Sequence, residues 1–253
     1  MQFISPHLHK EIFGWHSPRL GMHMPIVRYG NWGKALLIFP TAAADFLENE
    51  RFFLIKALEP HIFAGKLQVF CIDSINKHAW MNRQIPVPEK ARRQALYSAY
   101  VEEEVVPHIR RCLQDQGARL AVSGASFGAF HAANTFFRRP DQFDTLFAMS
   151  GFYDLGPDYL DGYSDQNAYF NNPMWFVKNI EGAPLETIRR HSQIHLVTGQ
   201  GQWEAPQCTV RFSELLWSKG IWHNRDMWGH DMAHDWPTWR LMVDHYAGHR
   251  LGL

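Results

Sequence analysis

The sequence predicts a single α/β domain in which helices cover both faces of a mostly parallel sheet. Three observations support this fold class: short, continuous apolar runs that suit buried strands, helical segments that alternate with these runs, and an antiparallel strand pair at the N-terminus. The chain has 253 residues, of which 46% are hydrophobic and 20% are charged. That length and composition allow one large domain with a substantial core.

The elements follow one another in a regular order. Alternating polar and apolar residues over Ile12–Tyr29, around a Ser-Pro-Arg-Leu-Gly turn, predict two antiparallel strands. Apolar runs predict buried strands at 34–39, 67–72, 119–123, 145–150 and 194–198, and a weaker strand at 222–227. Helices are predicted at about 48–58, 89–114, 129–138, 207–219 and 237–248. Pro107 should kink the second of these helices or split it in two.

One segment, about 151–190, lacks a clear period and is rich in Tyr, Phe, Asn, Asp and Pro. It follows the carboxyl end of a predicted strand, the edge at which α/β sheets bind ligands. We therefore interpret the chain as one domain over 1–253 with an aromatic-rich insertion that covers the site. The aromatic residues considered for a pocket are Tyr153, Tyr159, Tyr163, Tyr169, Phe170, Trp175 and Trp203.

The most informative motif is Gly124–Gly128, which reads Gly-Ala-Ser-Phe-Gly. It lies between a predicted strand and a predicted helix, the arrangement of a nucleophile elbow. Glycine on both sides of Ser126 allows the close backbone approach that such a turn requires. The alternative is a tight turn whose serine only caps the next helix.

A serine nucleophile needs an imidazole to take its proton, and in this arrangement the chain order is serine, acid, histidine. His234 lies just before the Pro237 that should start the last helix, so it is the predicted base, with His230 as the alternative. His131 is too close to Ser126 along the chain and is interpreted as a polar residue of the helix. His230 and His234 are four residues apart, but a third ligand is missing, so no metal is predicted.

The acid should follow the strand at 194–198, where Glu204 is the only carboxylate of the loop. A carboxylate there would fix the imidazole tautomer and stabilise the imidazolium. Asp154 and Asp226 are the alternatives.

Two backbone N–H groups are expected to form the oxyanion hole. The first belongs to Phe127, the residue after the nucleophile. The second should come from the loop after Lys34–Phe39, from Thr41 or Ala42, because Pro40 has no N–H.

Composition excludes several function classes. Twenty-five basic and 25 acidic residues give a formal net charge of zero, which argues against a nucleic-acid partner. Three scattered cysteines form neither a disulfide framework nor a metal or redox pair. No signal peptide or membrane-spanning stretch is recognised, so the protein is expected in the cytoplasm. We also expect a small-molecule ester as substrate and no cofactor. Self-association is left open.

Taken together, Gly124–Gly128 and His234–Trp239 (His-Asp-Trp-Pro-Thr-Trp) resemble the esterase D-like family of α/β-hydrolases, and within it a bacterial subgroup with a His-Asp-Trp-Pro run. Ser150–Asp154 and Asn171–Pro173 also resemble that subgroup. The resemblance implies an α/β-hydrolase fold and a serine hydrolase with Ser126 and His234 as its nucleophile and base. Many esterase D-like enzymes place an Asp where this chain has Glu204, so the acid is carried over less directly.

The sequence therefore predicts a serine-dependent esterase that acts through an acyl-enzyme. Related acyltransferases of the same fold imply a second possible acyl acceptor besides water. The alanines of the loop after Pro40, which replace the usual glycines, also allow a non-catalytic binding protein built on the same scaffold.

Overall fold

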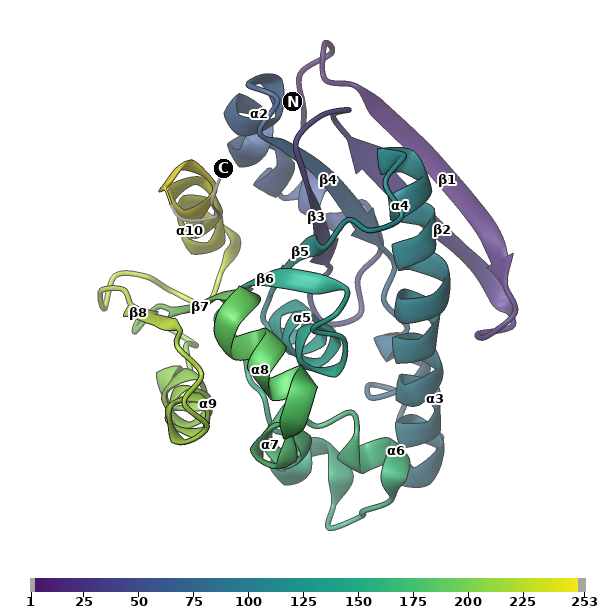
Figure 1. Cartoon of the computed structure of the whole chain (residues 1–253), viewed down its shortest axis with the longest axis vertical. Coiled ribbons are helices and arrows are strands. Elements are labelled where there is room, and N and C mark those ends of the chain that lie inside the picture. The colour runs from purple at the N-terminus through teal and green to yellow at the C-terminus, as the bar shows by residue number, and fades with distance from the viewer. Residues whose placement is uncertain (1–2, 250–253) are drawn as a thin grey trace.

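An eight-stranded sheet forms the centre of the molecule in the computed structural model, which describes residues 3–249 (Figure 1). The strand order is β1-β2-β4-β3-β5-β6-β7-β8. The pairs β1–β2 and β2–β4 are antiparallel, and every other pair is parallel. The strands are β1 (Lys10–Ser17), β2 (Met22–Tyr29), β3 (Lys34–Phe39), β4 (Leu67–Ile72), β5 (Leu120–Ala125), β6 (Phe143–Met149), β7 (Gln193–Thr198) and β8 (Asn224–Met227). The predicted fold class is confirmed.

Helices cover both faces of this sheet. The larger helices are α2 (Leu54–Phe63), α3 (Val87–Tyr100), α4 (Val106–Leu113), α5 (Phe127–Arg138), α8 (Gly182–His191), α9 (Pro206–Ser218) and α10 (Trp236–His249). One core cluster joins α3, α4, α5, α8 and α9 to one face of the sheet, and a second joins α2 and α10 to the other. Figure 1 shows α2 and α10 side by side near the two chain ends.

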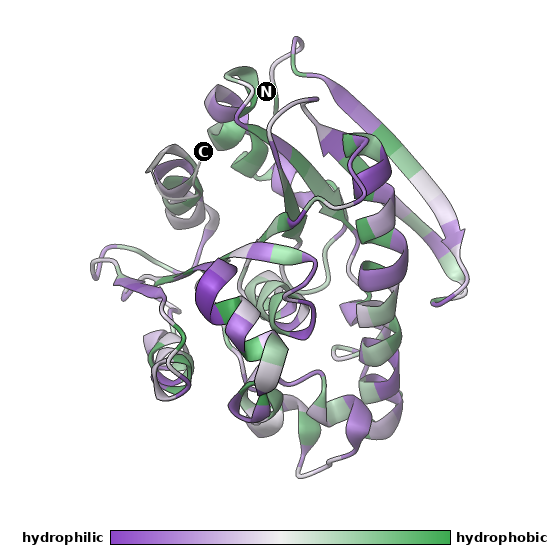
Figure 2. Cartoon of the chain, in the orientation of Figure 1, coloured by the Kyte–Doolittle hydropathy of each residue, from purple (hydrophilic) through white to green (hydrophobic). Residues whose placement is uncertain are grey.

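The central strands are apolar because both of their faces are covered. All six residues of β4 and of β5 are buried, and so are the last five of β3. In Figure 2 these strands are largely green, whereas the outer faces of the helices carry the purple, hydrophilic residues. Each large apolar side chain buried in this way stabilises the fold by about 1.5–3 kcal/mol.

The long helix predicted over 89–114 is divided into three parts. A five-residue π-helix (Val101–Val105) separates α3 from α4, and Pro107 lies in the first turn of α4. The proline ring would clash with a carbonyl one turn earlier in a regular α-helix. The wider π-turn directly before it relieves that clash, which is how the predicted split arises.

Two other predicted elements differ from the structure. The helix expected at 48–58 is broken into α1 (Glu48–Arg51) and α2, because Phe53 adopts a φ of 63° between them. The end of the predicted irregular segment is a regular ten-residue helix, α8. Before it lie a π-helix (Gly156–Leu160), a 3₁₀ turn (Val177–Asn179) and two one-turn helices, α6 (Gln166–Tyr169) and α7 (Pro173–Phe176). A further 3₁₀ turn (Asn76–His78) follows β4.

None of the helices among residues 3–249 is both long enough and apolar enough to cross a lipid bilayer. Cys71, Cys112 and Cys208 are all free thiols.

Candidate active site

Ser126 lies at a sharp turn between β5 and α5. Its φ of 56° and ψ of −120° fall in a region that a non-glycine residue rarely adopts. A Cβ on Gly124 would come within 2.4 Å of the Gly128 backbone, and a Cβ on Gly128 within 2.7 Å of the Phe39 and Pro40 carbonyl oxygens. The two glycines therefore permit the turn for the steric reason that the motif predicts, and the helix after it begins at Phe127, two residues earlier than expected.

Two loops at the same edge of the sheet bring an acid and a base together. The loop after β7 contacts the loop after β8 through the N–H groups of Gln200 and Gly201, which donate to the carbonyls of Gly229 and Met232 (3.2 and 2.9 Å). The His234 N–H donates to the Gln202 carbonyl at 2.9 Å. These bonds leave the His234 Nδ1 atom 3.3 Å from the Glu204 Oε2 atom.

The Glu204 side chain is only 1% exposed, and its carboxylate accepts several hydrogen bonds from the protein. Ser150 Oγ donates to Oε1 at 2.5 Å, Thr198 Oγ1 to Oε2 at 3.2 Å, and the Gly199 N–H to Oε1 at 3.2 Å. Burial raises the pKa of Glu204, but the hydrogen bonds from His234, Ser150 and Gly199 outweigh it and the pKa lies below its usual value. The carboxylate is thus ionised at neutral pH.

Trp239 and Ser150 support this pair, and the sequence argument gave neither a role. Trp239 Nε1 donates to Ser150 Oγ at 3.0 Å, and the Trp239 ring meets the His234 ring edge-on with centroids 5.0 Å apart. Ser150 has a φ of 49° directly after β6. A serine followed by glycine at a strand end is the signal that could have pointed to this residue.

The alternative residues are engaged elsewhere. Asp154 accepts hydrogen bonds from the Gly156 N–H and from Asn172, and Asp226 accepts from Trp228 and Tyr246. His230 is exposed. Within residues 3–249 no group of three or more His, Cys, Asp or Glu side chains is arranged to hold a metal ion.

The two loop residues considered for the oxyanion hole differ in their contacts. The Thr41 N–H donates to Glu48 Oε2 at 2.8 Å and the Thr41 hydroxyl to Glu48 Oε1 at 2.7 Å, so this N–H is already used. At Ala42 it is the carbonyl oxygen that is bound, by Asn76 Nδ2 (2.6 Å) and Ser74 Oγ (3.3 Å). The Phe127 N–H lies in the first turn of α5, where N–H groups have no acceptor within the helix.

Aromatic residues of the 151–190 segment pack on the start of α5. Phe152 and Tyr159 meet the Phe127 ring edge-on, with centroids 4.9 and 5.5 Å away. Tyr153, by contrast, is a core residue stacked on Phe212. Trp203, next to Glu204, is 81% exposed. The aromatic set is therefore divided between packing and exposed positions.

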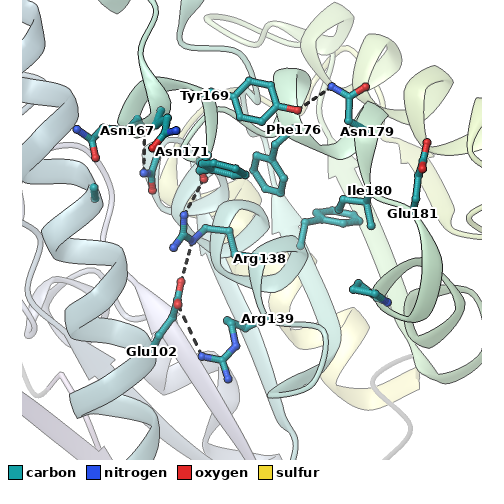
Figure 3. Close-up of a pocket in the computed structure, with 15 residues that line it drawn as sticks. Glu102, Arg138, Arg139, Asn167, Tyr169, Asn171, Phe176, Asn179, Ile180 and Glu181 are labelled. Atoms are coloured by element: carbon teal, nitrogen blue, oxygen red, sulfur yellow. Dashed lines mark hydrogen bonds and ion pairs between the residues drawn. The ribbon is translucent and has the colours of Figure 1, made fainter.

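A separate cavity of about 590 Å³ lies at the other end of α5 (Figure 3). Figure 3 shows Arg138 beside the Glu102 carboxylate, to which it donates at 2.7 Å. Arg138 also donates to the Phe170 carbonyl at 2.9 Å. Because α5 has 12 residues, this cavity is about 18 Å along the helix from Ser126. Glu102 pairs there with both Arg138 and Arg139. The distance along α5 separates this cavity from the site around Ser126.

The fold and this site define an α/β-hydrolase with the features of a serine esterase: a serine at a nucleophile elbow and a histidine–carboxylate pair at the same sheet edge. Residues 70–249, more than half of the chain, match the family described as "Putative esterase", so the chain belongs to that family. No curated protein sequence matches the chain significantly.

Several solved structures share the fold at low identity. A ferulic acid esterase is 15% identical with a TM-score of 0.71, over 94% of this chain and 95% of that one. An S-formylglutathione hydrolase from Staphylococcus aureus is 14% identical with a TM-score of 0.70, over 96% of each chain. A fluorophosphonate-binding serine hydrolase of the same organism is 14% identical with a TM-score of 0.73, over 95% of this chain and 97% of that one.

Proposed function

We propose that this esterase-family protein hydrolyses small carboxylic esters with Ser126 as nucleophile, His234 as general base and Glu204 as the acid of the triad. One observation carries the proposal: Nδ1 of His234 lies 3.3 Å from a buried, ionised Glu204 carboxylate, in a loop at the strand edge where Ser126 occupies a strained turn. A carboxylate at Nδ1 selects the tautomer whose Nε2 atom is free to accept a proton.

The reaction follows from these roles. The Ser126 oxygen attacks the ester carbonyl carbon while His234 Nε2 takes the hydroxyl proton. The resulting oxyanion accepts hydrogen bonds from the N–H groups of Phe127 and Ala42; Ala42 is preferred because the Thr41 N–H donates to Glu48. When the tetrahedral intermediate collapses, His234 returns the proton to the leaving alcohol and Ser126 carries the acyl group.

Water then completes the cycle. His234 takes a proton from a water molecule that attacks the acyl carbonyl, and the second intermediate collapses to the free acid and Ser126. An alcohol in place of water would give acyl transfer, which is the second candidate reaction. Ferulic acid esterase and S-formylglutathione hydrolase, named among the similar structures, direct the first substrate panel to esters of ferulic acid and to small thioesters.

The test combines turnover with labelling of the nucleophile. Short-chain p-nitrophenyl esters should show a burst of p-nitrophenol, and a fluorophosphonate probe should label Ser126. Ser126→Ala should abolish both. Ser123→Ala is the matched control, because Ser123 lies on β5, the strand that leads into Ser126, with a buried hydroxyl that has no hydrogen-bond partner among the described residues.

Absence of turnover and of labelling in the parent protein would overturn the proposal in favour of a non-catalytic binding protein.

We also expect a cytoplasmic location, which cell fractionation would check. A search of residues 151–190 for variants that change KM would test the expectation that this segment covers the site.

A further inference from the structure

A buried amide connects the loop after β3 to the helix that follows Ser126. Asn76, which is 0% exposed, donates from Nδ2 to the Ala42 carbonyl at 2.6 Å. Its Oδ1 atom lies 3.1 Å from Nε2 of His131, on α5. Ser74 Oγ reaches the same carbonyl at 3.3 Å and accepts from the Asn76 N–H at 3.0 Å. The amide thus bridges two segments that the catalytic proposal places on opposite sides of the oxyanion.

The Ala42 N–H lies between two anchored groups. On one side the Thr41 N–H is bound by Glu48, and on the other the Ala42 carbonyl is bound by Asn76. The Ala42 N–H belongs to the Thr41–Ala42 peptide, and these bonds hold the peptide units on either side of it. Contacts with residues outside this loop therefore limit the backbone dihedrals of Thr41 and Ala42, and with them the directions that the Ala42 N–H can take.

The Ala42 carbonyl and His131 together fix which way the Asn76 amide faces. Burial lowers the pKa of His131 to about 3, so the ring is neutral and carries a single N–H. With that hydrogen on Nε2, His131 donates to Asn76 Oδ1, and the Asn76 Nδ2 must face Ala42. If the amide were reversed, its oxygen would face the Ala42 carbonyl oxygen, an arrangement without a hydrogen bond.

The His131 ring also packs against the other proposed donor residue. It stacks on the Phe127 ring, with centroids 5.3 Å apart and an interplanar angle of 28°. Phe39 and Tyr97 enclose it at 5.6 and 5.2 Å. One imidazole thus contacts the amide that holds Ala42 and the side chain of Phe127, although the sequence indicated only a polar helix residue.

We propose that Asn76 is a positioning residue that orients the Ala42 peptide as an oxyanion donor, and that His131 locks the Asn76 amide in the orientation this requires. The proposal rests on the proposed esterase function. Neither residue touches the substrate; both act through the backbone at Ala42.

The first test separates transition-state stabilisation from substrate binding. Asn76→Ala should lower kcat by about 10- to 100-fold on a p-nitrophenyl ester, because it leaves the donor present but badly oriented, whereas loss of an oxyanion donor reduces kcat by about 10²–10³. KM should change by less than about threefold, since the donor acts on the tetrahedral state. The inhibition constant of a matching trifluoromethyl ketone, which forms a tetrahedral adduct, should rise as kcat/KM falls.

The second test uses two substitutions of His131 that differ in whether the new side chain can donate a hydrogen bond to Asn76. His131→Phe keeps an aromatic ring among its neighbours but cannot donate to Asn76, and it should lower kcat by about 3- to 10-fold. His131→Gln provides an amide N–H for Asn76 and should recover most of that loss. If Asn76→Ala does not fold, the comparison of His131→Phe with His131→Gln still tests the proposal.

Asn134→Ala is the matched control, because Asn134 is also a buried asparagine and contacts Ser98 and Asn171, not the loop at Ala42. It should keep kcat within about twofold of the parent. An active parent with Asn76→Ala at parental kcat, or with equal activity in the two His131 variants, would overturn this inference and leave the esterase proposal standing. An inactive, unlabelled parent would overturn the esterase proposal itself.

Discussion

Two buried glutamates flank the central strand β5, and they are held in different ways. Glu48, beside β3, accepts hydrogen bonds from the N–H and the hydroxyl of Thr41. Glu204, beyond β7, accepts from a backbone N–H and two hydroxyls and also contacts the His234 imidazole. Burial raises the pKa of Glu48 in spite of its two bonds, whereas the pKa of Glu204 is lowered.

This difference shows on which side of the site the fold stabilises an ionised side chain. On the Glu204 side, a carboxylate is stabilised in its ionised form by a partner that becomes cationic during the proposed proton transfer. On the Glu48 side, the Ala42 carbonyl is bound by the Asn76 amide and the Ser74 hydroxyl, and the neutral His131 imidazole contacts that amide. A developing oxyanion would therefore meet dipoles rather than a second ionised carboxylate in contact with its donor, which suits preorganised stabilisation of negative charge.

The largest expected effect is the loss of the base. His234→Ala should lower kcat by at least about 10⁴-fold, because no other group would take the Ser126 proton. His230→Ala, which removes an exposed histidine four residues earlier, should leave kcat within about twofold. Steady-state kinetics on a p-nitrophenyl ester measures both, and comparable losses in the two variants would contradict the assignment of the base.

The two glutamates should differ next. Glu204→Gln should lower kcat by about 10²- to 10⁴-fold, because an amide neither selects the His234 tautomer nor stabilises the imidazolium. Glu48→Gln should lower it less than about tenfold, since an amide can still bind Thr41. Both are measured under saturating substrate. Equal losses would mean that the contact with His234 does not distinguish the two carboxylates.

The same pair should respond to pH with opposite sign. A lowered pKa means that the contribution of Glu204 to stability is present above its unfolded pKa of about 4.5 and is lost as pH falls through the folded value. A raised pKa means that the contribution of Glu48 is present below about 4.5 and is lost as pH rises through the folded value.

Thermal unfolding between pH 3 and 8 checks this. Glu204→Gln should flatten the fall in Tm on the acid side of pH 4.5, and Glu48→Gln should flatten the decline above it, each by about 2–4 °C. A change of the same sign in both variants would remove the contrast between the two glutamates.

The smallest expected effect concerns the backbone at Ser150. Both Ser150→Ala and Ser150→Gly remove the hydroxyl that joins Trp239 to Glu204, but only glycine adopts a φ of 49° without strain. Ser150→Gly should therefore be about 1 kcal/mol more stable than Ser150→Ala in urea unfolding. A more stable alanine variant would show that the turn is unstrained.

Much of this arrangement follows from the sequence alone. Apolar runs predicted the central strands because a strand covered on both faces must be apolar throughout, and β3 and β4 begin and end at the predicted residues. The elbow at Ser126 was predictable because only glycine fits at 124 and 128. Chain order and loop position led to His234 and Glu204, which the structure brings into contact.

Only the tertiary structure decided the rest, because those features depend on segments that are distant along the chain. Nothing near Ser150 predicts that its hydroxyl bonds both Glu204 and Trp239, 54 and 89 residues away. Likewise, the role of His131 depends on Asn76, 55 residues earlier, and that of Thr41 depends on which of its groups Glu48 binds. Local pattern fixes which strands are buried, but the register of parallel strands fixes which loops meet at their ends.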